Sequence, residues 1–153
     1  MMTEEKTGTP VGARYSHAQA LEILAAGRPA NIKASAEKVL DTLGEVAVVV
    51  NRTGLAMLPL TDTVHGTAFH LGEVLVSEAH IRVPERSVEG YGAVVGRDLE
   101  HAMAMAVIDA AIAADQSADI IVELLDIERG HQEEEDRLLL RKVEATRVQM
   151  ETF

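Results

Sequence analysis

Residues 99–112 constrain the fold most, because this segment has the composition of a helix with almost no polar face. Asp98 precedes it as a suitable N-cap, and Glu100 favours the positive end of a helix dipole. A helix that is apolar all round must be buried all round. One sheet covers only one side of such a helix. The other side therefore requires helices of the same chain or another protein.

The N-terminal part of the chain predicts two helices that can supply this cover. Ser16 and Gln19 have the spacing of a capping box, which starts a helix that Gly27 closes. Pro29 suits the first turn of a second helix, and Gly44 ends it. The second helix carries apolar residues at helical spacing, namely Ile32, Ala36, Val39, Leu40 and Leu43. We expect a helical hairpin with one buried face.

Between residues 45 and 95 the pattern changes to β-prone runs separated by polar turns. The runs lie at residues 46–50, 55–60, 68–83 and 90–95. Residues 51–54, Asn-Arg-Thr-Gly, have the composition of a hairpin turn. Alternation fails near Gly72, which indicates a β-bulge. Because no helix separates the runs, we expect an α+β fold with a four-stranded antiparallel sheet.

The C-terminal segment, residues 118–150, predicts a long helix, which Gly130 is expected to kink or divide. We expect residues 1–13 to be flexible and residues 14–153 to form a single domain. The N-terminus lacks the apolar core of a signal peptide, and the longest apolar run is too short to span a bilayer. These features predict a soluble cytoplasmic protein.

Charge and residue types argue against several functions. The net charge of −11 argues against binding nucleic acid, or cradling a triphosphate without help. The chain has no cysteine, which excludes disulfides, thiolate metal sites and cysteine nucleophiles. The sequence His70-Leu71-Gly72-Glu73 lacks the second histidine of a zinc-protease motif, so we predict no metal site. No Ser-His-Asp set or P-loop can be assembled, and no catalytic residue is assigned.

Two motifs near the apolar helix allow more than one interpretation. Gly90, Gly92 and Gly96 superficially match a dinucleotide-binding fingerprint, but the spacing is wrong, and turn and strand-end glycines explain them better. The corner at Gly96-Arg97-Asp98 either only caps the helix or also presents Arg97 to an anion near the helix start. Capping suffices for Asp98, and Arg97 is a candidate anion contact.

Several short motifs together resemble one family in their order and spacing. They are Leu24-Ala25, Pro29-Ala30, Thr53-Gly54-Leu55, Phe69-x-Leu71-Gly72-Glu73-x-Leu75-Val76, Gly90-Tyr91, Gly96-Arg97-Asp98, Ala145-Thr146-Arg147-Val148 and Thr152-Phe153. From about Leu21 onward the chain resembles PhnG, the small G subunit of the bacterial carbon–phosphorus (C-P) lyase core complex.

This resemblance implies a hetero-oligomer with the PhnH, PhnI, PhnJ and PhnL subunits. Such a complex transfers alkylphosphonate to the ribose C1 of MgATP and releases adenine, a transferase step in phosphonate catabolism. The resemblance assigns nucleosidase-type catalysis to PhnI, and the iron–sulfur cluster and S-adenosylmethionine to a partner subunit. It implies that this chain is an accessory subunit, without a cofactor of its own and inactive alone.

Partner contacts are expected at two segments of the chain. Phe69, His70 and Glu73 lie in a strand whose glycine and embedded glutamate suit an internal sheet poorly, and an exposed edge invites pairing with another chain. Arg147 and the terminal Phe153 form the second candidate, because a large apolar side chain at a chain end stabilises nothing unless it is buried. The alternative is a small binding or enzymatic domain that associates with itself.

Overall fold

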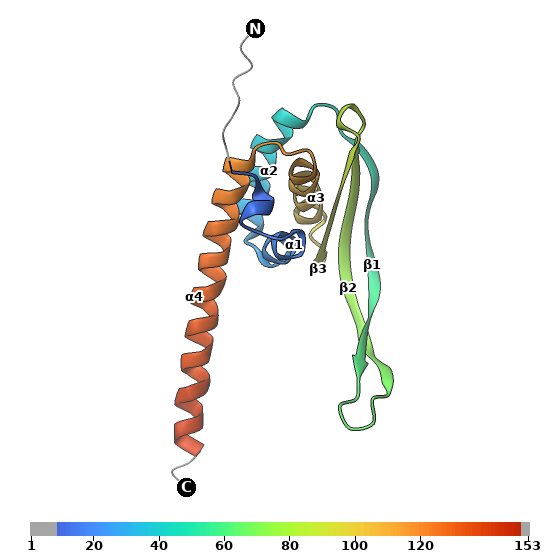
Figure 1. Cartoon of the computed structure of the whole chain (residues 1–153). Helices are drawn as coiled ribbons and strands as arrows, with labels where there is room; N and C mark the ends of the chain where they lie inside the picture. The colour runs from blue at the N-terminus through green and yellow to red at the C-terminus, as the bar shows by residue number, and fades with distance from the viewer. Residues whose placement is uncertain (1–8, 151–153) are drawn as a thin grey trace.

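The computed structural model describes residues 9–150 as an α+β fold (Figure 1). The elements in chain order are η1 (Val11–Ala13), α1 (His17–Ala26), α2 (Pro29–Leu43), β1 (Ala47–Thr61), β2 (Ala68–Val83), η2 (Pro84–Arg86), β3 (Val88–Val95), α3 (Leu99–Ala113) and α4 (Ala118–Met150). The strands form one antiparallel sheet, and α3 packs on one of its faces. α2 and α4 lie on the far side of α3 from the sheet, and α1 packs against α4, α3 and β3.

α3 is the buried helix that the sequence predicts. Ten of its fifteen residues are buried. One side contacts β2 and β3, and the other contacts α1, α2 and α4. The cover that an all-apolar helix requires therefore comes from this chain's own helices. The sequence left open whether that cover came from the same chain or from a partner.

The N-terminal signals of the two helices are confirmed. The Ser16 hydroxyl accepts from the Gln19 amide, and the Gln19 side chain accepts from the Ser16 amide, which completes the capping box. Pro29 begins α2, and Gly44 ends it with φ +86°. The two helices do not form the expected hairpin, because α1 packs mainly against α4, β3 and α3, and α2 mainly against α3 and α4, rather than against each other. Val11, within the segment expected to be flexible, is buried in η1, which packs on α4.

The sheet has three strands, and the prediction of four is wrong. Residues 51–54 do not turn but continue β1, paired with residues 76–79 of β2. Gly54 has no positive φ and open space around it, so nothing forces a turn there, whereas the long β2 offers backbone partners throughout. The hairpin turns at residues 62–67, where the Asp62 carboxylate accepts hydrogen bonds from two backbone amides.

The irregularity predicted near Gly72 is confirmed. Leu58 pairs with Gly72 and Pro59 with His70, which leaves Leu71 without a partner in the ladder. Two residues on β2 therefore oppose one on β1, which is the geometry of a bulge.

Gly90 and Gly92 face α3, and the helix backbone approaches them closely. A Cβ on Gly90 would lie 2.0 Å from the Ala106 carbonyl oxygen, and one on Gly92 would lie 2.3 Å from the Ala102 carbonyl oxygen. The interpretation of these two as turn or strand-end glycines is therefore wrong. Only Gly96 lies at the corner, with φ +103°. Small residues on both surfaces let the helix lie directly against the sheet.

α4 runs without interruption from Ala118 to Met150, so the predicted break at Gly130 is wrong (Figure 1). A single glycine costs a helix about 1 kcal/mol relative to alanine, which its neighbours can offset. The ion pair between Arg129 and Glu133, at 3.0 Å, spans this position. Arg129 also lies over the ring of Tyr15, at 5.9 Å from its centroid. The ion pair supports the helix across Gly130, and the Tyr15 contact ties the middle of the helix to the body.

We expect Gly130→Ala to raise the free energy of unfolding by about 0.5–1 kcal/mol, because alanine loses less backbone entropy in a helix. The new Cβ would meet nothing within 4 Å. Urea denaturation measures the change. Gly44→Ala is the opposing control, since φ of +86° disfavours a side chain there and should lower stability. A loss of stability in Gly130→Ala would contradict the prediction.

Candidate protein-interaction surface

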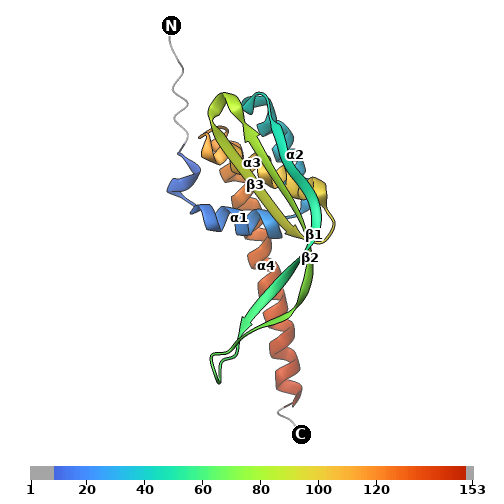
Figure 2. The same cartoon turned by 90° about the vertical axis from the view of Figure 1, so that its right-hand side faces the viewer.

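Two segments extend beyond the packed body in the same direction (Figures 1 and 2). The hairpin arm, residues 53–76, consists of the parts of β1 and β2 that extend from the last residues of β3 outward. The helical arm, residues 133–147 of α4, consists of residues that are all exposed. In Figure 1 the helical arm descends on the left and the hairpin arm on the right.

The hairpin arm is apolar and largely exposed. No described helix covers it, so its two-stranded ribbon presents side chains on both faces. The exposed large apolar residues are Leu55, Met57, Leu58, Leu60, Val64, Phe69 and Leu71, with Leu55 at 66% and Met57 at 59% exposure. A two-stranded hairpin without a hydrophobic partner is at best marginally stable in water. The composition of this arm therefore suits a surface that another protein covers.

The helical arm also exposes a cluster of apolar side chains. These are Leu138, Leu139, Leu140 and Val143. The stripe of α4 that faces the body continues into the arm at helical spacing. Its members are Ile121, Leu125, Glu128, Gln132, Glu135, Leu139 and Val143. The face that binds α4 to its own domain thus extends past that domain.

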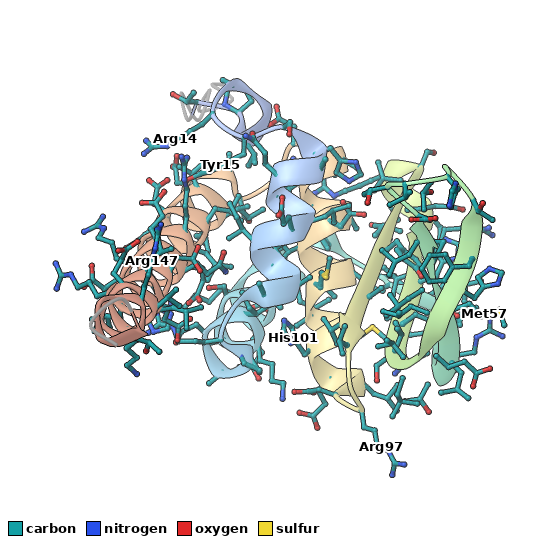
Figure 3. The ribbon with its side chains drawn as sticks, turned by 90° about the horizontal axis from the view of Figure 1, so that it is seen from below. Arg14, Tyr15, Met57, Arg97, His101 and Arg147 are labelled. Atoms are coloured by element: carbon teal, nitrogen blue, oxygen red, sulfur yellow. The ribbon has the colours of Figure 1, made fainter. Side chains whose placement is uncertain are left out.

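Single exposed apolar residues are ordinary on protein surfaces, whereas grouped ones mark interaction sites. Here they are grouped on the two arms. Figure 3 shows Met57 of the hairpin arm and Arg147 of the helical arm on opposite sides of the body. The two arms thus form separate surfaces, which a large partner could contact together.

The predicted partner contacts lie on these arms where the structure describes them. Phe69, His70 and Glu73 are exposed on the hairpin arm, and Arg147 is exposed on the helical arm. Phe153 lies outside the described residues. The structure does not bring the strand residues and Arg147 together, because Met57, the partner of Glu73 in the sheet, lies on the opposite side of the body from Arg147 (Figure 3). Their role in binding stays a prediction.

The sequence predicts a partner at Phe69, His70 and Glu73 because their strand suits an internal sheet poorly, but the position of β2 gives a different reason. β2 is the central strand, with β1 on one side and β3 on the other. β3 pairs only with residues 76–83, and the Gly96 amide donates to the Leu75 carbonyl, so residues 68–74 have an open edge on that side. Gly72 and Glu73 therefore belong to an edge within the hairpin arm, although the same strand is internal in the body.

The candidate anion contact Arg97 is exposed at the corner before α3 and points away from the body (Figure 3). Its backbone carbonyl accepts from the Leu99 amide at 3.1 Å, but within residues 9–147 no hydrogen bond or ion pair involves its side chain. The helix start is occupied by Asp98, whose Oδ1 accepts from the His101 amide at 3.0 Å. This backbone hydrogen bond and the ammonium of Lys33 hold the pKa of Asp98 below its usual range. Asp98 is confirmed as the cap, and anion binding by Arg97 stays a prediction.

Asp109 is the acidic exception inside apolar α3, and its carboxylate joins three elements. Its Oδ2 accepts from the Tyr91 amide of β3 at 2.9 Å, and its Oδ1 lies 2.6 Å from Nε2 of His17 on α1. No hydroxyl in the described part of the chain is bonded to either side chain of this His–Asp pair. The pair therefore lacks a nucleophile and holds elements together. The sequence signal for this buried carboxylate was a single acidic residue within an apolar run.

Glu128 is a second buried acid, which sequence reasoning missed. Its carboxylate accepts from the Arg28 amide at 3.0 Å, the Asn31 side chain at 2.8 Å and the Arg28 guanidinium at 3.2 Å. Burial alone would raise the pKa of Glu128, but these donors together lower it. The carboxylate thereby fastens α4 to the start of α2. The only signal was a glutamate on the inward stripe of a helix.

The outer face of the sheet carries another polar network. Glu78 accepts from the Tyr91 hydroxyl and from Nε of Arg52, each at 2.6 Å. These two bonds hold the pKa of Glu78 below its usual range, with the Tyr91 bond the larger cause. The network links all three strands on an exposed face and therefore contributes mainly to their alignment.

The clusters around Asp109, Glu128 and Glu78 hold helices and strands of the fold together. Throughout residues 9–147, each buried polar side-chain atom has a hydrogen-bond partner, and no group of three or more His, Asp or Glu could hold a metal ion. None of the described helices is both long and apolar enough to cross a bilayer. Apolar arms, rather than a reactive centre, are the outstanding feature of the described surface.

Comparison with known proteins places the chain in a family. A search of curated proteins finds no match. The family model described as phosphonate metabolism protein PhnG matches residues 16–153. This match covers α1 to the C-terminus and includes both arms. The chain therefore belongs to the PhnG family of phosphonate metabolism proteins.

Proposed function

We propose that this chain is an accessory, non-catalytic subunit of the C-P lyase core complex. In this role it supports the transfer of alkylphosphonate to the ribose C1 of MgATP, with release of adenine. PhnI supplies the nucleosidase-type catalysis, and a partner subunit holds the iron–sulfur cluster and S-adenosylmethionine. The chain contributes surfaces that assemble and shape its partners PhnH, PhnI, PhnJ and PhnL in the cytoplasm.

The observation that carries this proposal is the pair of apolar arms. Leu55 and Met57 on one arm, and Leu139 and Leu140 on the other, each expose about half or more of their surface. Burial of apolar area contributes roughly 25 cal/mol per Å², so covering such side chains favours association. The polar clusters of the described residues are already engaged in holding the body together. The arms thus suit assembly better than independent catalysis.

The first test is activity with and without partners. We expect the pure chain to release no adenine from MgATP and alkylphosphonate, because the described residues offer no nucleophile–base pair. Co-expression with PhnH, PhnI and PhnJ should give a stable complex that releases adenine, quantified by chromatography. Adenine release by rigorously pure chain would contradict the accessory role.

The second test is the helical arm. Leu139→Glu combined with Val143→Glu should abolish co-purification with PhnI, because both changes place charge on the apolar members of the stripe within the helical arm. Ile127→Glu is the matched control, since Ile127 is 51% exposed on the part of α4 that packs on the body. Circular dichroism checks that each variant keeps its helices. Undiminished complex formation by the double variant would contradict docking through this arm.

Self-association is the competing proposal, and the same arms would serve it. A stable homo-oligomer of the isolated chain, with no binding to any of the other subunits, would favour it. Light scattering distinguishes the two proposals.

A further inference from the structure

β1 is an edge strand that is open on its outer side. It contributes fifteen residues to the sheet, and β2 is its only strand neighbour. Among residues 9–147, no hydrogen bond reaches a backbone group of β1 from outside β2. An open edge of this length is a template for another strand.

The opposite edge of the same sheet, formed by β3, is covered. There the Tyr91 amide of β3 is bonded to the Asp109 carboxylate at 2.9 Å, and α1 packs against the strand. β3 is also short, with eight residues. The fold therefore closes one edge with a buried acid and a helix and leaves the longer edge open.

Two independent observations show which amides of β1 point outward. The Tyr91 amide points away from β2, so its partner His80 directs its backbone groups toward β1, where it is paired with Val50. Alternation then places the even residues 50–58 in the ladder and the odd residues on the open edge. Pro59 has no N–H to donate, and alternation places it on that edge too. The outward amides are those of Asn51, Thr53, Leu55 and Met57.

The usual protections of an edge are missing along this stretch. Edges are commonly blunted by charges, prolines or bulges. β1 has a bulge at Val49 and a proline at residue 59, and between them the only charged residue is Arg52, which is paired with Glu78. Residues 50–58 are otherwise regular.

The charge of the hairpin arm limits what can bind there. Residues 53–76 contain the carboxylates of Asp62 and Glu73 and no Lys or Arg. A second copy would bring the same acids and the same net charge of −11 to the interface. A complementary strand therefore belongs to a different chain and carries basic residues among its apolar ones.

We propose that residues 51–57 of β1 accept an extended, basic and apolar segment of a partner subunit as a fourth strand of this sheet. The inference rests on the proposed function, because it specifies how a partner is held. Main-chain hydrogen bonds from the four outward amides supply the attachment. Exposed Leu55 and Met57 supply apolar contact.

The test compares two substitutions at Leu55 in the full chain co-expressed with PhnH, PhnI and PhnJ. Leu55→Pro removes an outward amide and leaves the ladder to β2 intact. Leu55→Ala removes the same side chain but keeps that amide. We expect Leu55→Pro to lower the yield of complex about tenfold or more relative to Leu55→Ala. Circular dichroism and thermal unfolding of each isolated variant confirm that the hairpin is kept.

Hydrogen–deuterium exchange gives a second measurement that does not depend on a variant. In the isolated chain, residues 50–58 should show fast exchange at the four outward amides and slow exchange at the others. In the complex the fast group should slow about a hundredfold or more. The segment at residues 76–79, which is paired on both sides already, is the internal control.

The charge argument has its own test. Asp62→Lys combined with Glu73→Lys replaces the two acids of the hairpin arm with bases, and this change should weaken the complex about tenfold.

The outcomes separate this inference from the proposed function. A complex that forms equally with Leu55→Pro and Leu55→Ala, with the four outward amides still exchanging fast, overturns the inference and leaves the accessory role standing. Absence of any complex with the native chain overturns both. Protection of the four amides in a homodimer of the isolated chain assigns the edge to a second copy and also overturns the inference.

Discussion

Gly90→Ala is expected to destabilise the protein by about 3 kcal/mol or more, enough to unfold a domain of ordinary stability in part or in full. The new Cβ would lie 2.0 Å from the Ala106 carbonyl oxygen and 2.7 Å from the Ala110 amide nitrogen. Both atoms belong to the backbone of α3, so no side chain can rotate away. The helix must move off the sheet, and its buried apolar contacts with β2 and β3 weaken together.

Matched controls exist in the same sheet. Gly54→Ala and Gly72→Ala add the same methyl group where nothing lies within 4 Å, and neither glycine has a positive φ. Both should change the free energy of unfolding by less than about 1 kcal/mol. Urea denaturation followed by circular dichroism measures all three variants. Equal stabilities for Gly90→Ala and the controls would contradict the close packing of α3 on β3.

Glu128→Gln is expected to lower the free energy of unfolding by about 2–3 kcal/mol. The amide keeps the shape of the side chain but loses the charge, and it turns an N–H group toward the donors of Arg28 and Asn31. The Glu128 side chain is fully buried, whereas the Arg28 side chain is 44% exposed. Water therefore still reaches the guanidinium, so the expected loss of stability is smaller than for a fully buried ion pair.

Glu133→Gln is the control on the same helix. Its ion pair with Arg129 is exposed, so its loss should cost less than about 1 kcal/mol. Chemical denaturation at neutral pH distinguishes the two changes. Similar small losses for both variants would show that Glu128 does not fasten α4 to α2.

The same substitution should make stability depend on pH. The folded pKa of Glu128 is lowered, so its contribution is fully present above the unfolded pKa of about 4.3 and is lost as pH falls through the folded value. The difference between the native chain and Glu128→Gln should therefore be largest near neutral pH and narrow on acidification below about pH 4.3. Other acids with lowered pKa values, such as Asp98 and Glu89, are common to both proteins and cancel in this difference. A constant difference down to about pH 3 would contradict the prediction.

The sequence predicted the helices well because their signals are local. The capping box at Ser16, Pro29 at the start of α2 and Asp98 before α3 each satisfy backbone groups within one turn. The absence of a polar face on α3 predicted its burial for the same reason, since composition alone decides whether a helix can face water. Membership of the PhnG family, which the motifs indicated, is also confirmed by the match to residues 16–153.

Local signals failed where longer contacts decide the structure. Residues 51–54 have the composition of a turn, but pairing with residues 76–79 holds them in β1. Gly130 weakens a helix by propensity, but the neighbouring contacts of Arg129 hold α4 straight. In both cases the cost of an unsuitable residue is near 1 kcal/mol, which the surrounding contacts outweigh.

What the sequence by itself determined is the set of helices, the buried character of α3 and the family of the chain. What only the tertiary structure decided is the partnership of residues far apart in the chain. Gly90 meets Ala106 because α3 crosses β3, and Glu128 meets Arg28 because α4 returns to the start of α2. The open edge of β1 is likewise a feature that only the tertiary structure decides. Whether a strand is internal or at an edge depends on which other strands reach it, and no local pattern of residues encodes that.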